Sequence, residues 1–243
     1  MVISRGGASP AIIAVVITLA LDTSTRTGGC AVLRGDDVLA EVPGDTSRTH
    51  AERLPGDLMA ALAHARLGLP DVELFAVATG PGSFTGLRVG IATMQGLALA
   101  GNRPLVGISV LDALARAGGG EAGARVAAWV DAWRGEVYAA LYDGVHEAEG
   151  ASVELPAAIL ARLRGSRTRF VGDGAAAHRD AIAAAMGAQA LLDMPLEPPL
   201  AGIIGRLARR EVQAGRRPGP ADIQPLYVRR PDAELARDAR VER

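Results

Sequence analysis

Two segments of the chain repeat one pattern, and this repeat limits the folds that the chain can adopt. VVITLALDTSTRTGGCAVLRG at residues 15–35 and VAAWVDAWRGEVYAALYDG at residues 126–144 each begin with an apolar strand that ends in an aspartate, followed by a glycine-containing turn and an apolar return strand. The aspartates, Asp22 and Asp131, are about 109 residues apart, which suits one α/β lobe and is too long for a solenoid repeat. The repeat predicts two α/β lobes, each with a mixed sheet that begins with a hairpin and is covered by helices.

Hydrophobic periodicity predicts the other elements. Apolar runs bounded by turns indicate strands, and a stripe with a period of 3.6 residues indicates a helix. We expect strands at residues 14–21, 72–80, 104–109 and 169–176, and short strands on both sides of Gly35-Asp36-Asp37. We expect helices at residues 49–67, 157–164 and 200–214. Further helices are expected from the loop after residue 80 to about residue 101, directly after residue 109, and up to residue 186.

A glycine run at residues 118–120 predicts the boundary between the lobes. We assign residues 1–13 to a disordered leader, 14–109 to the first lobe, 110–199, including the short helix before the glycine run, to the second lobe, 200–230 to a C-terminal helix and strand, and 231–243 to a flexible tail.

Composition restricts the core and the partners. Hydrophobic residues make up 49% of the 243 residues and aromatic residues only 3%, so the core must consist of alanine, valine, leucine and isoleucine. The formal net charge of −1 argues against autonomous nucleic-acid binding, which usually requires a basic surplus. Positive charge is concentrated in residues 206–243, with ten arginines against six acidic residues. This segment is either a solvated tail or a contact for RNA or an acidic partner.

The cysteine and the apolar runs indicate a cytoplasmic protein. Cys30 is the single cysteine, which excludes an intramolecular disulfide and a thiolate zinc site and favours a core position. The longest apolar run, residues 11–21, is shorter than the roughly 20 residues that a membrane-spanning helix needs. We therefore expect no membrane contact.

A glycine-rich loop, TGPGSFTGLRVGIATMQGLA at residues 79–98, leads directly into a predicted helix. Such a loop at a helix N-terminus is suited to phosphate, but the chain contains no lysine to complete a phosphate loop. Gly86 and Gly90 lie inside the helix, where each costs about 1 kcal/mol relative to alanine. Close approach of a second backbone, within the chain or across a subunit contact, would explain them, and phosphate binding is the alternative.

The two hairpin turns predict a nucleotide site in the cleft between the lobes. The phosphates would lie against the turns, acids would hold a hydrated metal, and the glycine-containing VGDGAA segment would lie behind the base. The residues assigned to this site are Asp22, Thr23, Ser24, Asp131, Gly172 and Gly174. The alternative for residues 22–24 is an Asx or Ser/Thr turn that only closes the hairpin.

The chain lacks the residues that several kinds of catalytic site require. The histidines are His50, His64, His146 and His178. None of them forms an HxxxH or HExxH pair, which argues against a helical zinc or iron site, and His50 and His64 suit surface or interface positions. The chain has neither a lysine for a Schiff base nor a GxSxG elbow. Asp173 is either an acid or a turn residue. No catalytic set is recognisable.

The motifs LALDTST, THAERLP, GPGSFTGLRVGIATMQGLA, VDAWRGEVY, VGDGA and PLYVRR occur in this order. Together they resemble the TsaB (YeaZ) family of bacterial tRNA threonylcarbamoyladenosine biosynthesis proteins, over residues 16–230. The resemblance implies a two-lobed, duplicated actin/Hsp70-like fold (the ASKHA class, ribonuclease H-like). It also implies a non-catalytic subunit that binds the catalytic paralogue TsaD, which modifies adenosine 37 of tRNAs that read codons beginning with A. Residues 106–115 lack the metal-binding histidines of that paralogue.

The resemblance further implies the partners. TsaB helices pack against TsaD or against a second copy in a homodimer, and the ATPase TsaE joins a larger assembly. The chain itself would require no cofactor, with ATP or ADP and Mg²⁺ at the partner contact, and tRNA would be reached only through the complex. The residues of this chain that the resemblance places at the interface are Leu54, Leu58, Leu62, Gly86, Gly90, Ile91 and Met94.

Two enzymatic alternatives stay open. One is an ATP-dependent kinase or ATPase of the same fold, with Asp22 and Asp131 around Mg²⁺. The weaker one is a metallopeptidase.

Overall fold

The computed structural model of the protein describes residues 15–119, 124–144, 146–193, 195–216 and 218–228. The predicted leader at residues 1–13 and the predicted tail at 231–243 lie outside the described residues.

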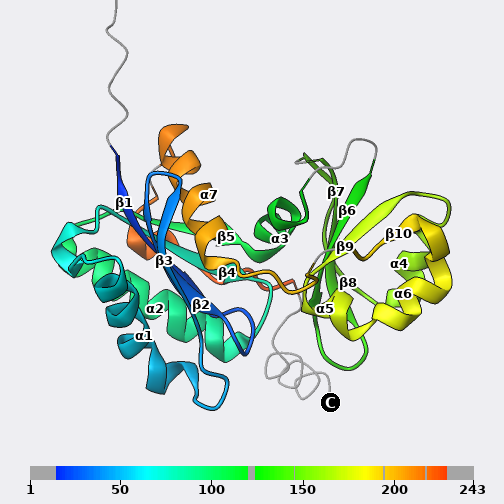
Figure 1. The fold of residues 1–243 in the computed structure, drawn as a ribbon, viewed down its shortest axis with the longest axis horizontal. Helices are drawn as coiled ribbons and strands as arrows, with labels where there is room; N and C mark the ends of the chain where they lie inside the picture. The colour runs from blue at the N-terminus through cyan, green and yellow to red at the C-terminus, as the bar shows by residue number, and fades with distance from the viewer. Residues whose placement is uncertain (1–14, 120–123, 145, 194, 217, 229–243) are drawn as a thin grey trace, which may run out of the picture.

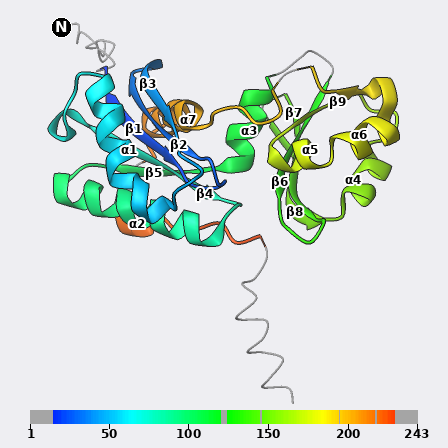
Figure 2. The same ribbon diagram turned by 60° about the horizontal axis from the view of Figure 1, so that its bottom comes forward.

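Two five-stranded sheets lie in the two halves of the chain (Figures 1 and 2). The first sheet contains β1 (Ile17–Asp22), β2 (Gly29–Arg34), β3 (Asp37–Pro43), β4 (Leu74–Gly80) and β5 (Leu105–Ser109). The second sheet contains β6 (Arg125–Asp131), β7 (Val137–Asp143), β8 (His146–Glu154), β9 (Thr168–Val171) and β10 (Ala190–Leu191).

The two sheets share one topology. Their strand orders are β3-β2-β1-β4-β5 and, from the corresponding edge, β8-β7-β6-β9-β10. In both, the central strand pairs antiparallel with the next strand of the chain and parallel with the strand on its other side. The predicted duplication of an α/β lobe is thereby confirmed.

Helices cover both sheets (Figure 1). They are α1 (His50–His64), α2 (Phe84–Gly101), α3 (Val110–Gly118), α4 (Pro156–Leu163), α5 (Asp173–Ala177), α6 (Arg179–Met186) and α7 (Ala201–Gln213), with 3₁₀ turns at Leu69–Asp71, Gly187–Gln189 and Pro220–Asp222. Since alternate strand residues face opposite sides, Leu19 and Leu21 of β1 pack with α1 and α2, whereas Ala20 packs with α3 and α7. Val126 and Val130 of β6 join the same cluster as Ala20, so one apolar core continues between the lobes.

Three predictions differ from the structure. Strand β8 was not predicted because it is glutamate-rich and mostly exposed at the sheet edge, so it lacks an apolar pattern. The strand predicted at residues 169–176 ends at Val171, because Gly172 has a φ of 112° and α5 begins after it. The described part of residues 200–230 contains α7 but no strand. Its PLYV segment is attached to the first sheet by one backbone bond, from the Leu226 N–H to the Thr79 carbonyl at 2.7 Å.

The glycines of α2 allow close packing within the chain, as one of the two explanations predicted. A Cβ atom at Gly86 would overlap the carbonyl oxygen of Thr23, and one at Gly90 would overlap the Thr23 side chain. The Ser83 N–H donates to the Ser24 carbonyl at 2.6 Å, and the Ser83 side chain caps the helix by accepting from the Gly86 N–H at 3.2 Å. The start of α2 is therefore held against the turn between β1 and β2.

This packing predicts opposite effects of two glycine-to-alanine substitutions in α2. Gly86→Ala should lower the free energy of unfolding by about 1–3 kcal/mol, because the added methyl group must displace backbone. Gly96→Ala is the matched control, since no atom lies within 4 Å of its Cβ position, and it should stabilise the fold by up to about 1 kcal/mol. Urea unfolding of both variants measures the difference. Equal effects would contradict the packing described.

Candidate functional site

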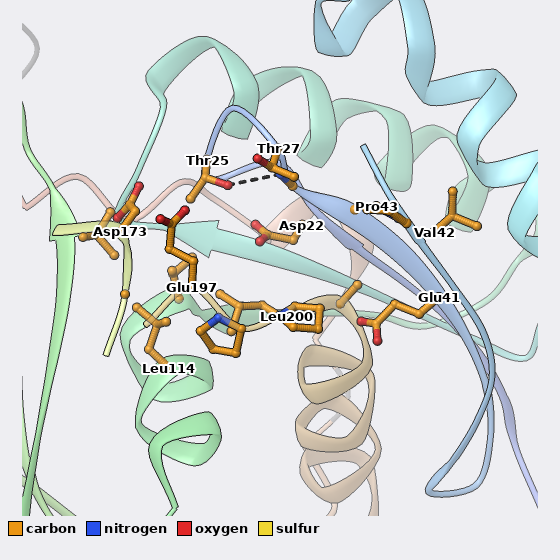
Figure 3. A pocket seen from close by; sticks show the side chains of 18 residues that line it. Asp22, Thr25, Thr27, Glu41, Val42, Pro43, Leu114, Asp173, Glu197 and Leu200 are labelled. Carbon is orange, nitrogen blue, oxygen red and sulfur yellow. Dashed lines mark hydrogen bonds between the residues drawn. The ribbon is translucent and has the colours of Figure 1, made fainter. Parts of the chain in front are cut away.

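A cavity of about 520 Å³ lies between the lobes (Figure 3). It is bounded by the β1–β2 turn, the end of β3, α3, the β9–α5 junction and the segment that leads into α7. Its lining residues are Asp22, Thr25, Thr27, Gly28, Gly29, Glu41, Val42, Pro43, Val110, Leu114, Val130, Gly172, Asp173, Glu197, Pro198, Pro199, Leu200 and Ala201.

In the first hairpin turn, Asp22 faces this cavity, whereas Thr23 and Ser24 do not. Asp22 is buried, and its Oδ1 accepts a hydrogen bond from the Ser24 N–H at 2.8 Å. Burial raises the pKa of the Asp22 carboxyl above its ordinary value. Thr23 and Ser24 are buried and do not line the cavity, because they pack beneath α2. The geometry is that of the Asx-type turn that was the alternative to an anion site.

The second hairpin turn does not face the cavity with its aspartate. Asp131 is not among the lining residues, and its Oδ1 accepts from the Trp133 N–H at 2.9 Å to close the β6–β7 turn. Asp173 lies at the cavity instead, where its Oδ1 accepts from the N–H groups of Asp131 at 3.0 Å and Gly174 at 2.8 Å. Burial raises the pKa of Asp173 to about 6.

The two predicted glycines have different surroundings. Gly172 lines the cavity, whereas a Cβ at Gly174 would lie 2.9 Å from the carbonyl carbon of Val130. Gly174 thus serves the packing of α5 on β6. Of the six residues predicted for a nucleotide, only Asp22 and Gly172 line the cavity.

The charge of the cavity does not fit a nucleotide polyphosphate. Four carboxylate residues, Asp22, Glu41, Asp173 and Glu197, line it without any basic side chain. Phosphates placed there would be repelled, because like charges in a partly buried site interact strongly. A bridging metal would need carboxylates that converge, yet the described residues contain no group of three or more metal-ligating side chains placed to hold an ion. No sequence motif pointed to Glu41, which lies in β3, or to Glu197, which lies in the loop before α7.

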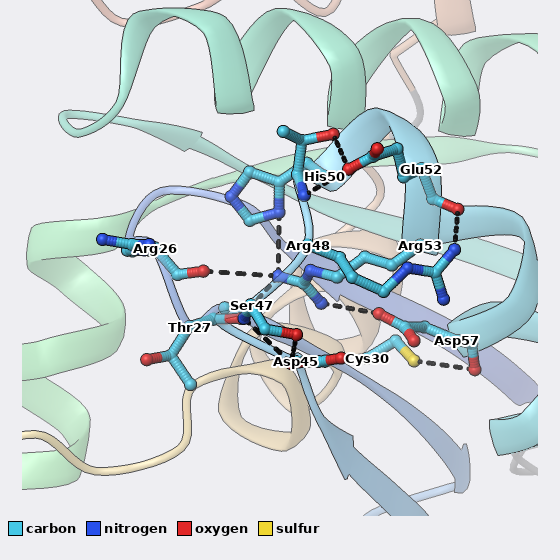
Figure 4. A network of polar contacts seen from close by, with 12 residues as sticks. Arg26, Thr27, Cys30, Asp45, Ser47, Arg48, His50, Glu52, Arg53 and Asp57 are labelled. Carbon is cyan, nitrogen blue, oxygen red and sulfur yellow. Dashed lines mark hydrogen bonds and ion pairs between the residues drawn. The ribbon is translucent and has the colours of Figure 1, made fainter.

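A buried arginine holds the first hairpin turn from behind (Figure 4). Arg53 of α1 is 2% exposed and pairs with Asp57 at 2.6 Å, and its Nη2 donates to the Thr27 carbonyl at 2.6 Å. Nη2 also contacts His50 Nδ1 at 2.8 Å, and His50 Nε2 lies 3.0 Å from the Thr25 carbonyl. Because Nδ1 faces a guanidinium donor, it must accept, so His50 is neutral with its proton on Nε2.

This network corrects the position expected for His50. The residue is half-buried between the hairpin turn and α2 rather than on a free surface, and its ring lies beside Gly86. The THAERLP motif therefore anchors the wall of the cavity, since Thr25 and Thr27 both line it.

Comparison with known proteins identifies the family. A family model described as "TsaD: tRNA N6-adenosine threonylcarbamoyltransferase" matches residues 40–194. An uncharacterized protein of Mycobacterium tuberculosis is 35% identical over 220 residues, which cover 89% of this chain and 93% of that protein. The structure of YeaZ from Pseudomonas aeruginosa is 30% identical, with a TM-score of 0.67 over 87% of this chain and 99% of that one. The chain belongs to the TsaB/YeaZ family.

A named member of the family is similar over part of its length. The tRNA threonylcarbamoyladenosine biosynthesis protein TsaB of Escherichia coli is 38% identical over 126 residues, which cover 51% of this chain and 54% of that protein. Family membership and the two matching sheets confirm the predicted actin/Hsp70-like fold of two α/β lobes.

The residues that the TsaB/YeaZ resemblance placed at a partner contact lie inside the first lobe. Each is at most 4% exposed or packs as a buried glycine of α2. They are Leu54, Leu58, Leu62, Gly86, Gly90, Ile91 and Met94. The apolar stripes of α1 and α2 were assigned to a partner, but they face the first sheet, where they shield Leu19, Leu21 and Val77 from water. A partner on these helices would instead meet their outer faces.

Among the described residues, none of the helices combines the length and the hydrophobicity that a membrane-spanning segment requires.

The His50 network predicts a pH dependence of stability. Burial and the neighbouring Arg53 lower the pKa of His50 below its ordinary value. The folded protein therefore favours the neutral ring, whereas the unfolded chain takes up a proton more readily. This contribution is complete above the ordinary pKa of about 6.5 and is lost as the pH falls below it. His50→Gln should flatten the decrease in melting temperature between roughly pH 7 and 5.

His64→Gln is the matched control, because His64 is exposed at the other end of α1. Thermal unfolding monitored by circular dichroism across this pH range tests the prediction. Parallel pH profiles for the parent and His50→Gln would show that His50 does not carry the dependence.

Proposed function

We propose that this chain is a non-catalytic subunit of the machinery that forms threonylcarbamoyladenosine at adenosine 37 of tRNAs reading codons that begin with A. It acts by binding and supporting a TsaD-like transferase. The observation that carries the proposal is membership of the TsaB/YeaZ family, whose named relatives are tRNA threonylcarbamoyladenosine biosynthesis proteins. The match to the TsaD family description fits a paralogue of the transferase.

The outer faces of α1 and α2 support docking by a helical partner. Gly56 in α1 and Gly96 in α2 are exposed, and no atom of the chain lies within 4 Å of their Cβ positions. Each costs about 1 kcal/mol relative to alanine without a packing reason in the chain. Met59 and Leu99 lie on the same two helices and are 58% and 62% exposed. Small residues beside apolar side chains allow a second helix to approach closely.

The cavity supports a role without catalysis. The kinase or ATPase alternative needs Asp22 and Asp131 to share Mg²⁺, but only Asp22 lines the cavity. The cavity also has no basic side chain for a phosphate among its lining residues. A metallopeptidase lacks a ligand set among the described residues.

The wider assembly follows from the same proposal. A TsaE-like ATPase joins the pair, a second copy of the chain can occupy the same helices as a homodimer, and tRNA is reached through the transferase. Nucleotide with Mg²⁺ would then lie at the partner contact rather than in the cavity of this chain.

The docking surface can be tested by introducing a charge at apolar residues that have similar exposed fractions. Met59→Glu and Leu99→Glu should each weaken binding to the TsaD-like protein of the same organism by at least about 10-fold, because burying an unpaired carboxylate is costly. Leu155→Glu in the second lobe is the control, since Leu155 is 58% exposed. Isothermal titration calorimetry gives the affinities. Unchanged affinity for both α1 and α2 variants would remove this surface from the proposal.

The function itself is tested by in vitro tRNA modification with the reconstituted proteins. Omission of this chain should reduce threonylcarbamoyladenosine formation, and the chain alone should hydrolyse no ATP. Steady ATP turnover by the isolated protein that Asp22→Asn abolishes would favour the kinase or ATPase alternative instead.

A further inference from the structure

Two aromatic rings and an arginine form an exposed cluster at the start of α2. Phe84 and Tyr227 are each 39% exposed, and their ring centroids lie 5.3 Å apart. The guanidinium carbon of Arg88 lies 3.8 Å from the centroid of the Phe84 ring, and Arg88 Nε donates to the Tyr227 hydroxyl at 2.9 Å. The arginine is therefore held by the face of one ring and by the hydroxyl of the other.

Tyr227 reaches this cluster because the C-terminal segment at residues 218–228 is attached along α2 (Figure 2). The Gln95 side chain of α2 donates from Nε2 to the carbonyls of Pro220 at 2.8 Å and Ile223 at 3.1 Å. Ile223 is 7% exposed and packs in the core that α1 and α2 cover. The PLYV motif, to which the proposed function assigns no role, is thus positioned by α2 so that its tyrosine contacts the arginine.

The guanidinium of Arg88 keeps donors for another molecule. Its Nε is engaged, but among the described residues no oxygen accepts from its two terminal amino groups. Arg88 is exposed and is the only charged residue of α2. Planar guanidinium N–H groups match the two oxygens of a carboxylate. An arginine that is already fixed in place also loses little side-chain entropy when it binds.

The surroundings of Arg88 favour a protein partner over RNA. Ala92, Gly96 and Leu99 are exposed and follow Arg88 at intervals of three or four residues, so all four lie along the outer face of α2. Arginine and aromatic residues beside such a face are typical of the residues that dominate protein interfaces. RNA binding instead requires several cations along a phosphate backbone, and α2 supplies one.

We propose that Arg88, held in place by Phe84 and Tyr227, binds a carboxylate of the TsaD-like transferase at one end of the docking surface on the outer faces of α1 and α2. This inference rests on the proposed function and adds to it the residue that pairs with the partner's charge. Arg88 contacts the partner, and Tyr227 is a positioning residue that acts through Arg88. The C-terminal segment therefore contributes to docking by fixing the geometry of the arginine.

Calorimetric titration of the full chain with the TsaD-like protein of the same organism tests this assignment. Arg88→Gln should weaken binding by about 10- to 100-fold, as expected for a dominant interface residue. Tyr227→Phe keeps the ring but removes the hydroxyl acceptor, and it should weaken binding by about 3- to 10-fold. In the Arg88→Gln background Tyr227→Phe should have no further effect, because the hydroxyl acts through the arginine. Arg88→Gln should also reduce the salt dependence of the affinity.

Arg210→Gln is the matched control, because Arg210 is an exposed arginine of α7, on the opposite side of the first sheet. It should bind the transferase as the parent does, and circular dichroism verifies that all variants are folded. Binding by Tyr227→Phe at the parent's affinity, or the same loss in both backgrounds, would overturn its positioning role.

Two further outcomes separate this inference from the proposed function. Unchanged affinity for Arg88→Gln would overturn the inference, and the proposed function would stand because the parent still binds the transferase. Absence of binding by the parent would overturn both. Reduced tRNA affinity of Arg88→Gln in fluorescence anisotropy, with unchanged transferase binding, would show that the arginine contacts RNA instead.

Discussion

The close contact between the β1–β2 turn and α2 determines how the first lobe is built. Gly86 and Gly90 leave room for Thr23, and the Ser24 carbonyl accepts the Ser83 N–H at the start of the helix. The donors that a helix N-terminus could offer to a phosphate are thus partly used within the chain. A loop with the composition of a phosphate site here joins two elements of the fold, which explains why no lysine is needed beside it.

The sequence predicted the architecture well because the fold depends on local patterns. Apolar strands, glycine turns and helical stripes were enough to predict both lobes. The glutamate-rich edge strand β8 was missed, because an exposed edge strand needs no apolar residues. The site was predicted less well. The aspartates of the two hairpins are equivalent by sequence, and each accepts a hydrogen bond from the N–H two residues further on, but only Asp22 lines the cavity. Which of two equivalent turns faces a cavity depends on the packing of the lobes, which strand and turn patterns do not encode.

Helical stripes carry a similar ambiguity. The leucines of α1 suited either a core or a partner, and periodicity alone cannot distinguish these, since both need an apolar face. The distinction comes from what lies opposite each glycine. Gly90 meets Thr23, whereas Gly96 meets no atom of the chain. In the TsaB/YeaZ fold described here, glycines of one helix therefore serve two different faces, and only the outer one is open to another molecule.

The cavity and the outer faces of α1 and α2 are separate surfaces, and α1 contributes to both. Arg53 belongs to α1, and its guanidinium holds the Thr27 carbonyl of the turn that lines the cavity. On the opposite side of the first sheet, Ala20 of β1 and Val130 of β6 belong to one apolar cluster around α3. Opening the lobes like a hinge would expose that cluster to water, at roughly 25 cal/mol for each Å² of apolar surface. The apolar cluster around α3 therefore holds the two lobes together beside the cavity.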